Sequence, residues 1–507
     1  MLRSATVKWT PDLERPKRSK DAQWKAAEAA ARSGASTPMA YLKRRHMSNN
    51  MIITGTELLR HAPCGQEFGK NGGIERSVTS GWGYVMDNIQ IIKGNFFDCS
   101  QDMELRARID AYCVVKDGIS EGIFDKLPEK YAGAPVTDYG DMLIMPALVD
   151  LHTHAPQYTF HGMGMDLELL EWLNTYTFPE EARYRDLEYA SQAYDIFVDA
   201  LTRSGTGRAV IFGTIHTEAT LLLMEKLEKS GLVTYVGKVN MDRNSPDNYR
   251  EETEGSLRET ERFVEEALSF RSTFPILTPR FIPTCSDELM RGLSAIQKRT
   301  GLPAQSHLSE NRSEIEWVKE LVPDAAFYGD AYDIFGLFGG ECRTVMAHCV
   351  SSGKEEIERM AQKGVFVAHC PNSNTNISSG IAPVRKLLDA GIRVGLGSDV
   401  AGGHSLSLFD EMVSAVQVSN LRWRCIDQND RQLSMTEVFY MATRGGGEFF
   451  GKVGSFDRGY EFDALVVDDC GLAGMIKPDP AHRFLRSLYL SHECLLAAKY
   501  VKGNKIL

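Results

Sequence analysis

The sequence lacks the features that mark membrane-spanning, disulfide-rich or nucleic-acid-binding proteins. No apolar run in its 507 residues reaches the roughly 18 residues of a transmembrane helix, and no signal-peptide core precedes the first domain. Its ten cysteines form no Cys-x-x-Cys pair, which is typical of reduced thiols in a cytosolic enzyme. Acidic residues outnumber basic ones by 68 to 57, which argues against a polyanionic partner. We therefore expect a cytoplasmic protein that binds neither membranes nor nucleic acid.

Residues 1–48 differ in charge from the rest of the chain. They contain eleven lysines and arginines but only four acidic residues. We expect a basic, flexible tail, and Met47 offers an alternative start. Two interpretations as a targeting signal stay open. Residues 16–20 resemble a weak nuclear signal, and the basic excess is typical of a transit peptide, although the four acidic residues argue against the latter.

Short β-like segments, separated by glycine, asparagine and aspartate, occur towards both ends of the remaining chain. They lie at 52–53, 83–85, 89–92 and 111–115 in the N-terminal part, and at 462–467 and 500–505 in the C-terminal part. We expect residues 49–142 and 455–507 to combine in one small β-sandwich domain.

Residues 143–454 alternate between strand and helix patterns. Strands are predicted at 142–151, 208–215, 232–239, 275–281, 302–306, 343–347, 364–368 and 392–397. Helices are predicted between them, for example at 314–322, 354–363 and 382–390, and Ser434 and Glu437 have the spacing of a capping box at a helix start. Eight strands with intervening helices predict an α/β fold, a (β/α)8 TIM barrel, whose chemistry lies at the C-terminal ends of the strands.

Five histidines and one aspartate lie where these apolar segments end. They are His152, His154, His307, His348, His369 and Asp399. His152 and His154 are two positions apart, so their side chains leave a strand on the same side. An isolated His-x-His is equally consistent with two unrelated histidines. Several imidazoles and a carboxylate at matching strand ends instead predict a divalent metal site.

The types of ligand restrict the choice of metal. Imidazoles and a carboxylate without a thiolate cluster suit zinc or iron(II), and zinc is the commoner hydrolytic choice. A catalytic zinc lowers the pKa of its bound water to about 7. Glu310, three residues after His307, is a candidate general acid/base, a role that contributes about 10²–10⁴-fold to a rate. Taken alone, Glu310 would more simply be a carboxylate at a helix start.

Longer motifs carry a family resemblance. They are Leu169-Leu170-Glu171-Trp172-Leu173, Tyr176-Thr177-Phe178-Pro179, Thr278-Pro279-Arg280-Phe281, Ser306-His307-Leu308-Ser309-Glu310-Asn311, Ala368-His369-Cys370-Pro371-Asn372-Ser373-Asn374 and Gly397-Ser398-Asp399-Val400-Ala401-Gly402-Gly403. Together they make residues 50–507 resemble the amidohydrolase superfamily, and within it the guanine deaminases of animals and fungi. The resemblance implies a metal-bearing barrel and hydrolytic deamination of guanine to xanthine and ammonia.

The resemblance also implies roles for individual residues. The ligands of a single zinc would be His152, His154, His307 and Asp399. The catalytic residues would be Glu310 as proton shuttle, His348 as the residue that orients the attacking hydroxide, and Asp399; in some relatives His348 would touch the metal. The substrate contacts would be His154, Gln157, Arg280, Phe281, His307, Glu310 and Asp399.

The side chains assigned to the purine have suitable chemistry. Arg280 can donate to an O6 acceptor, Phe281 offers an apolar face for stacking, and Gln157 offers both a donor and an acceptor. The alternative for Arg280 is a surface ion pair, which its place after an apolar strand disfavours. We expect Trp172 and Phe178 to belong to a lid helix over the site. His216 and His369 are expected to brace the site rather than to bind metal.

Two motifs that are absent from the sequence restrict the expected metal site and fold further. Binuclear relatives have a carboxylated lysine at the fourth strand end, where this chain has Arg280, and Lys238 follows the third strand instead. The Pro-Cys-x-x-Cys motif of the other zinc-deaminase fold does not occur. The open alternatives are an amidohydrolase acting on adenine, thioadenosine or a triazine and, remotely, an inactive scaffold of the same fold. The resemblance also suggests a homodimer.

Overall fold

The computed structural model describes residues 89–507. The basic segment 1–48 and the strands expected at 52–53 and 83–85 therefore lie outside the described residues. None of the helices within 89–507 combines the length and the apolar character needed to cross a bilayer.

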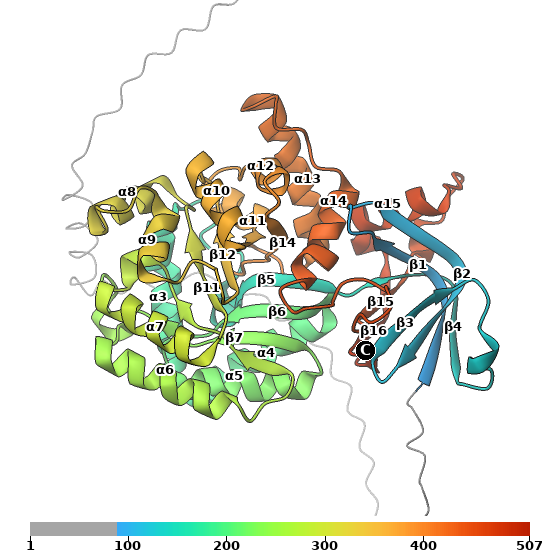
Figure 1. Cartoon of the computed structure of the whole chain (residues 1–507), viewed down its shortest axis with the longest axis horizontal. Coiled ribbons are helices and arrows are strands. Elements are labelled where there is room, and N and C mark those ends of the chain that lie inside the picture. Colours follow the sequence, from blue (N-terminus) through green and yellow to red (C-terminus); the bar gives the residue numbers. More distant parts are fainter. Residues whose placement is uncertain (1–88) are drawn as a thin grey trace, which may run out of the picture. The chain divides into compact units, whose positions relative to one another are not determined.

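Eight parallel strands form the central sheet, in the order β11-β12-β13-β14-β5-β6-β7-β9 (Figure 1). They are β5 (Leu148–His154), β6 (Thr206–Phe212), β7 (Val233–Gly237), β9 (Thr273–Pro275), β11 (Ala304–Leu308), β12 (Thr344–His348), β13 (Phe366–His369) and β14 (Arg393–Leu396). Leu277, just after β9, forms a parallel bridge with Ala304 at the start of β11. Because this bridge joins the two edges, the sheet closes into the expected eight-stranded barrel.

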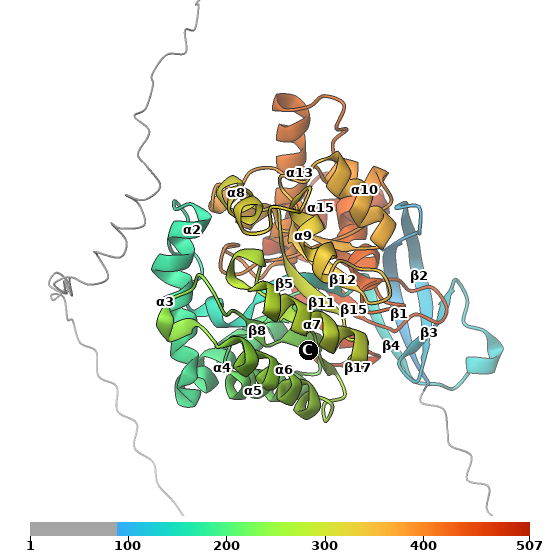
Figure 2. The same cartoon turned by 60° about the vertical axis from the view of Figure 1, so that its left-hand side comes forward.

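Helices follow the strands and surround the barrel (Figures 1 and 2). The longer ones are α4 (Leu187–Arg203), α5 (Thr217–Ser230), α6 (Thr253–Ala267), α7 (Asp287–Thr300), α8 (Arg312–Leu321), α9 (Tyr328–Phe335), α10 (Lys354–Lys363) and α13 (Leu408–Cys425). One further long helix, α15 (Pro480–Tyr489), belongs to the C-terminal part of the chain, and its Phe484 stacks on Phe97. The shorter ones are α2 (Leu169–Trp172), α3 (Phe178–Glu181), α11 (Pro371–Asn376), α12 (Val384–Asp389) and α14 (Met435–Tyr440). The capping box predicted at Ser434 and Glu437 is confirmed, and it begins α14.

Alternate residues of the barrel strands fill its interior. Val149 of β5, Val210 of β6, Val345 of β12 and Phe366 of β13 belong to one buried cluster, which Phe449 completes. Side chains that alternate with these face the surrounding helices, as expected for a barrel covered on its outside.

The two chain ends form a second, seven-stranded sheet, in the order β17-β16-β15-β4-β1-β2-β3. Its strands are β1 (Ile89–Cys99), β2 (Leu105–Lys116), β3 (Ile119–Phe124), β4 (Val136–Pro146), β15 (Ala464–Asp468), β16 (Leu495–Val501) and β17 (Asn504–Lys505). N-terminal Phe96 and Ile144 share a buried cluster with C-terminal Val466 and Tyr500. Residues from the two ends therefore share one β core.

The single strand predicted at 142–151 corresponds to two strands, which belong to different sheets. The apolar run 142–151 divides at Ala147, because residues up to Pro146 pair with β15 whereas those from Leu148 pair with β6. The boundary expected between residues 142 and 143 consequently falls inside β4. The run 275–281 divides similarly, since only β10 (Thr278–Pro279) continues it, paired with β8 (Val239–Asn240).

Candidate active site

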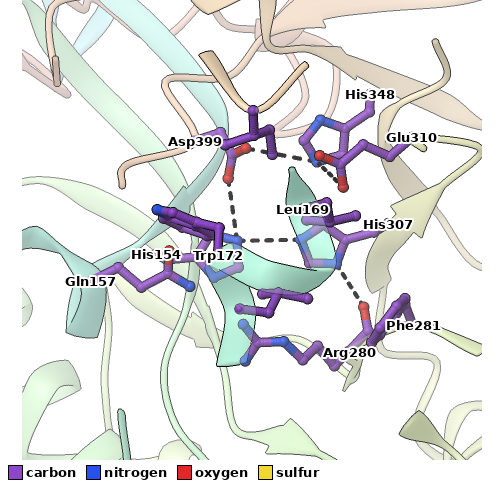
Figure 3. Close-up of a pocket in the computed structure, with 12 residues that line it drawn as sticks. His154, Gln157, Leu169, Trp172, Arg280, Phe281, His307, Glu310, His348 and Asp399 are labelled. Atoms are coloured by element: carbon purple, nitrogen blue, oxygen red, sulfur yellow. Dashed lines mark hydrogen bonds and ion pairs between the residues drawn. The ribbon is translucent and has the colours of Figure 1, made fainter. Parts of the chain in front are cut away.

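Polar side chains from four strands meet at the C-terminal end of the barrel (Figure 3). His152 and His154 end β5, His307 lies near the end of β11, His348 ends β12, and Asp399 follows β14. His152, His154, His348 and Asp399 are buried, and His307 is partly buried. The residues predicted as metal ligands are thus brought together from distant parts of the chain.

The distances between these side chains are those of a four-ligand metal site. The Nε2 atom of His154 lies 3.2 Å from Nε2 of His152 and 3.3 Å from Nε2 of His307. Oδ1 of Asp399 lies 3.1 Å from Nε2 of His152 and 3.3 Å from Nε2 of His154. Donors about 2.0–2.1 Å from a tetrahedral ion lie roughly 3.3 Å apart, so three imidazoles and one carboxylate fit such an ion.

Burial sets the protonation states that metal ligands need. It lowers the pKa of His154 to about 4 and the pKa of His307 well below its usual value. Burial alone would raise the pKa of Asp399, but His152 and His154 hold it well below its ordinary range. Neutral imidazoles and an ionised carboxylate are the forms that bind a divalent cation.

The backbone around the ligands is adapted to this convergence. The register between β5 and β6 shifts between Asp150 and Thr153, and such irregularities redirect side chains. His348 and Asp399 have φ values of 75° and 45°, in the left-handed region that non-glycine residues rarely adopt. Strained backbone of this kind persists where the surroundings enforce it, and it clusters at functional sites.

Hydrogen bonds fix the orientation of two of the rings. Nδ1 of His307 donates to the carbonyl oxygen of Arg280 at 2.6 Å, which leaves Nε2 as the free lone pair. Nδ1 of His348 lies 2.9 Å from Oδ1 of Asn374 and donates to it. Nε2 of His348 is buried and has no hydrogen-bond partner within residues 89–507. It lies 3.7 Å from Oδ2 of Asp399 and 3.4 Å from Oε2 of Glu310. This nitrogen is therefore available to a group bound between the two carboxylates.

Glu310 has the environment of a proton carrier. It is buried at the edge of the metal-ligand group, and Ser379 Oγ donates to Oε1 at 3.2 Å. Burial raises the pKa of Glu310 well above its usual value, and the negative charge of Asp399 raises it further. A buried carboxyl group with a raised pKa can both hold and release a proton near neutral pH.

A pocket opens beside this group. All seven residues predicted to contact the substrate line it, together with His348 and Trp172. Leu169, Leu173 and Ile377 also line it and were not predicted. Phe178 lies behind the pocket, with its ring 5.2 Å from the guanidinium carbon of Arg280.

Arg280 is not in a surface ion pair, so that alternative is wrong. Its side chain is buried, and Nη1 donates to Oε2 of Glu181 at 2.6 Å. Sequence reasoning missed Glu181, because nothing in its local pattern distinguishes it from a surface carboxylate of a short helix. Lys238 is engaged elsewhere, since its Nζ donates to Glu251 at 2.6 Å.

His216 and His369, which were expected to brace the site, are not part of the metal-ligand group. The ring of His216 packs 5.9 Å from that of Tyr249, and its Nε2 has no partner in the described structure. His369 is fully buried, and both of its ring nitrogens lack a protein partner among the described residues. The expected bracing by His369 is therefore not provided through hydrogen bonds.

Sequence relatives agree with this architecture. The model of the Amidohydrolase family matches residues 143–498. The guanine deaminase of Dictyostelium discoideum is 39% identical over 431 residues, which cover 82% of this chain and 91% of the relative. The guanine deaminase of Mus musculus is 46% identical over 331 residues, which cover 64% of this chain and 72% of the relative.

Solved structures give the same result. Guanine deaminase from C. acetobutylicum, with guanine bound in its active site, is 45% identical and superimposes with a TM-score of 0.80, covering 83% of this chain and 100% of that one. E. coli guanine deaminase is 30% identical with a TM-score of 0.75, covering 82% and 99%. The (β/α)8 fold expected from the sequence is confirmed. The chain belongs to the metal-dependent amidohydrolase family and, within it, to the guanine deaminases.

Proposed function

We propose that this protein is a zinc-dependent guanine deaminase that converts guanine and water to xanthine and ammonia. The observation that carries the proposal is the convergence of His152, His154, His307 and Asp399 beside a pocket with oxopurine-compatible donors. Relatives that are guanine deaminases, one with guanine in its active site, support the same substrate.

We assign the metal to His152, His154, His307 and Asp399. Three imidazoles with one carboxylate suit zinc better than a hard cation such as magnesium, which prefers oxygen ligands. When bound, zinc supplies the Lewis acidity that lets water act as a nucleophile near neutral pH. Of the remaining polar groups, His348 would orient that water through its unpartnered Nε2.

The rest of the pocket would hold the purine ring. Arg280 donates to O6, Gln157 contacts the same edge, and Phe281 stacks against the ring face. Leu169 and Trp172 cover the ring and exclude bulk water. Adenine carries an amino group where guanine has O6, so the donors of Arg280 disfavour it.

Glu310 would carry the protons of the reaction. As the water oxygen bonds to C2, Glu310 takes one water proton and delivers it to ring N3. It then transfers the second proton from that oxygen to the 2-amino group, and the C2–N bond breaks to release ammonia. The oxygen becomes the 2-oxo group of xanthine. A carboxyl group that both accepts and donates in this way needs the raised pKa that burial gives Glu310.

We also propose the wider organisation of the protein. The sequence supports a tail at 1–48, a barrel at 143–454 and a β domain drawn from 49–142 and 455–507. Because β4 extends to Pro146, we place the start of the barrel at Ala147. A cytoplasmic homodimer with one zinc per chain agrees with the family resemblance. Light scattering coupled to size-exclusion chromatography tests the dimer.

Turnover with ammonia release tests the proposed function. Purified protein should convert guanine to xanthine with one ammonia per turnover, and adenine, thioadenosine and triazines should react far more slowly. Metal-loaded protein that prefers one of those compounds, or releases no ammonia from guanine, would contradict the proposal.

A further inference from the structure

Glu181 is a buried carboxylate that the reaction above does not use. It ends α3, in the segment that carries Leu169 and Trp172 over the pocket, and its side chain is 0% exposed. We propose that Glu181 is a positioning residue that holds Arg280 and Gln157 as one donor pair, and that it thereby sets selectivity for 6-oxopurines. This inference rests on the proposed function, because that function assigns the two residues to the purine edge.

Four donors meet at the two oxygens of Glu181. Oε1 accepts from Nε2 of Gln157 at 2.8 Å and from Nη2 of Arg280 at 3.2 Å. Oε2 accepts from Nη1 of Arg280 at 2.6 Å and from the hydroxyl of Tyr249 at 2.7 Å. A carboxylate offers about four lone-pair sites, so this one is fully used. The bidentate bond to Arg280 fixes the plane of the guanidinium as well as its position.

The same carboxylate determines which way the Gln157 amide points. An ionised carboxylate only accepts hydrogen bonds, so the atom of Gln157 that faces it is the NH2 group. The oxygen of that amide accepts from the backbone N–H of Ala401 at 3.1 Å. The second N–H of Gln157 then remains for the pocket, beside the guanidinium of Arg280, and Figure 3 shows the ends of these two side chains approaching one another.

The charge of Glu181 also shapes the pocket. The guanidinium of Arg280 is buried, and a buried cation without a partner is strongly unfavourable. Pairing with Glu181 makes the donor pair neutral overall. A neutral pair whose N–H groups point at one edge of the base favours an uncharged base with acceptors on that edge. A base without acceptors there would leave these N–H groups without hydrogen-bond partners.

Glu181 joins its own helix to three other parts of the chain. Gln157 follows β5, Arg280 follows β10, and Tyr249 ends the turn Asp247–Tyr249. Each reaches Glu181 by a direct hydrogen bond. The segment that covers the pocket is therefore fixed to the two donors through this carboxylate, which links its position to the shape of the purine edge.

Equilibrium binding of two probes to the zinc-loaded protein tests the inference. Hypoxanthine has the 6-oxygen but no 2-amino group, and purine has neither. Because neither probe has a 2-amino group to lose, their binding is measured without turnover. In Glu181→Gln, four donors compete for one oxygen and the fixed geometry is lost. We expect the Kd of hypoxanthine to rise about tenfold or more and that of purine by less than about threefold. Zinc content should be unchanged, and KM for guanine should rise more than kcat falls.

Two further variants complete the test. Glu180→Gln is the matched control, because Glu180 is the neighbouring carboxylate but accepts from Thr159, Arg183 and Tyr189 rather than from pocket residues. It should bind both probes like the wild type. Glu181→Asp keeps the charge on a shorter side chain and should show the same selective loss at smaller size, which keeps the test decisive if Glu181→Gln does not fold.

Three outcomes would overturn the inference. They are equal weakening of both probes, no weakening in either Glu181 variant, and a wild-type protein that binds purine as tightly as hypoxanthine. If the wild type binds hypoxanthine selectively but does not deaminate guanine, the proposed reaction is wrong. The positioning role of Glu181 is then still tested by the difference between hypoxanthine and purine binding in the variants.

Discussion

At the scale of single residues, the site depends on which nitrogen of each histidine carries the proton. His307 and His348 each donate from Nδ1 to an oxygen, so Nε2 of each ring is the unprotonated atom that faces the site. The acceptor for His307 is a backbone carbonyl, which no substitution removes. The acceptor for His348 is the side chain of Asn374, which makes the tautomer of His348 open to experiment.

Replacing Asn374 tests this dependence. Asn374→Leu removes the acceptor, so the proton of His348 can move to Nε2 and block that nitrogen. We expect kcat for guanine to fall by about 10–100-fold with metal content unchanged. Asn374→Asp keeps an acceptor and should retain more activity. Equal losses in the two variants would show that the tautomer is not what Asn374 controls.

Glu310 and His307 should separate chemistry from metal binding. Glu310→Gln removes the proton carrier but no assigned ligand, so it should retain zinc and lose about 10²–10⁴-fold in kcat. His307→Ala should lose both zinc and activity. Metal analysis and steady-state kinetics on the two variants check this pair. An active Glu310→Gln enzyme would reject the shuttle role.

The sequence predicted the residues whose signal is local. Each histidine and Asp399 follows an apolar segment, so its place at a strand end could be read from its neighbours. Leu169, Ile377 and Glu181 carry no such signal. The first two reach the pocket, and Glu181 reaches Arg280, only through the packing of loops and short helices. An apolar or acidic residue in a short helix has the same sequence pattern whether it faces a pocket or not.

At the scale of strands, a buried carboxylate connects the segments that carry the first and the last of the four proposed ligands. Asp150 of β5 accepts from the backbone N–H groups of His152 and Ser398 at 3.0 and 3.1 Å, and from the hydroxyl of Ser398 at 2.6 Å. It therefore links the strand that carries two histidines to the residue before Asp399.

Removing one hydrogen bond of this link should weaken metal binding. Ser398→Ala removes the 2.6 Å bond and leaves a buried oxygen of Asp150 with one partner fewer. We expect zinc affinity to fall by about 10–100-fold, measured by competition with a chelator. Wild-type affinity in this variant would mean that the backbone bonds alone hold the two strands in place.

Element boundaries were less predictable than element types. Hydrophobicity marks 142–151 as buried, but a residue is equally buried in either sheet, so the change of partner at Ala147 leaves no trace in the pattern. β3 was not predicted, because its half-buried residues, Ile119–Phe124, have no continuous apolar run.

At the scale of the whole molecule, a buried ion pair ties the barrel to the sheet of the chain ends. Nε of Arg208, in β6, donates to Asp463 at 2.5 Å, and its Nη2 donates to Glu461; both acids precede β15. Arg208 and Asp463 are almost fully buried. Removing one partner of such a pair leaves an uncompensated buried charge.

Replacing Arg208 should destabilise the protein strongly. Arg208→Met should lower the free energy of unfolding by about 3–5 kcal/mol, and adding Asp463→Asn should restore part of the loss. Denaturant titration followed by circular dichroism measures both. A change below about 1 kcal/mol would show that the contact between the two sheets does not depend on this pair.

His369 should make the protein sensitive to acid. Burial lowers its pKa to about 3, against about 6.5 for an unfolded histidine. The unfolded chain therefore binds the proton first, so this contribution to stability is full above pH 6.5 and is lost as the pH falls towards 3. The loss is about 2 kcal/mol between pH 6.5 and 5.

A leucine at position 369 should reduce this loss. In denaturant titrations at pH 7 and pH 5, the decrease in stability should be smaller for His369→Leu than for the wild type. His492→Leu removes an exposed imidazole and serves as the control. An unchanged decrease in His369→Leu would assign the acid sensitivity to other groups.

The convergence of distant strand ends on one ion is the claim on which the rest depends. A crystal structure of the zinc-loaded protein, with anomalous diffraction measured at the zinc edge, tests it most directly. The predicted result is one peak per chain, about 2.0–2.2 Å from His152, His154, His307 and Asp399. A peak elsewhere, two peaks, or none at these four side chains would contradict it.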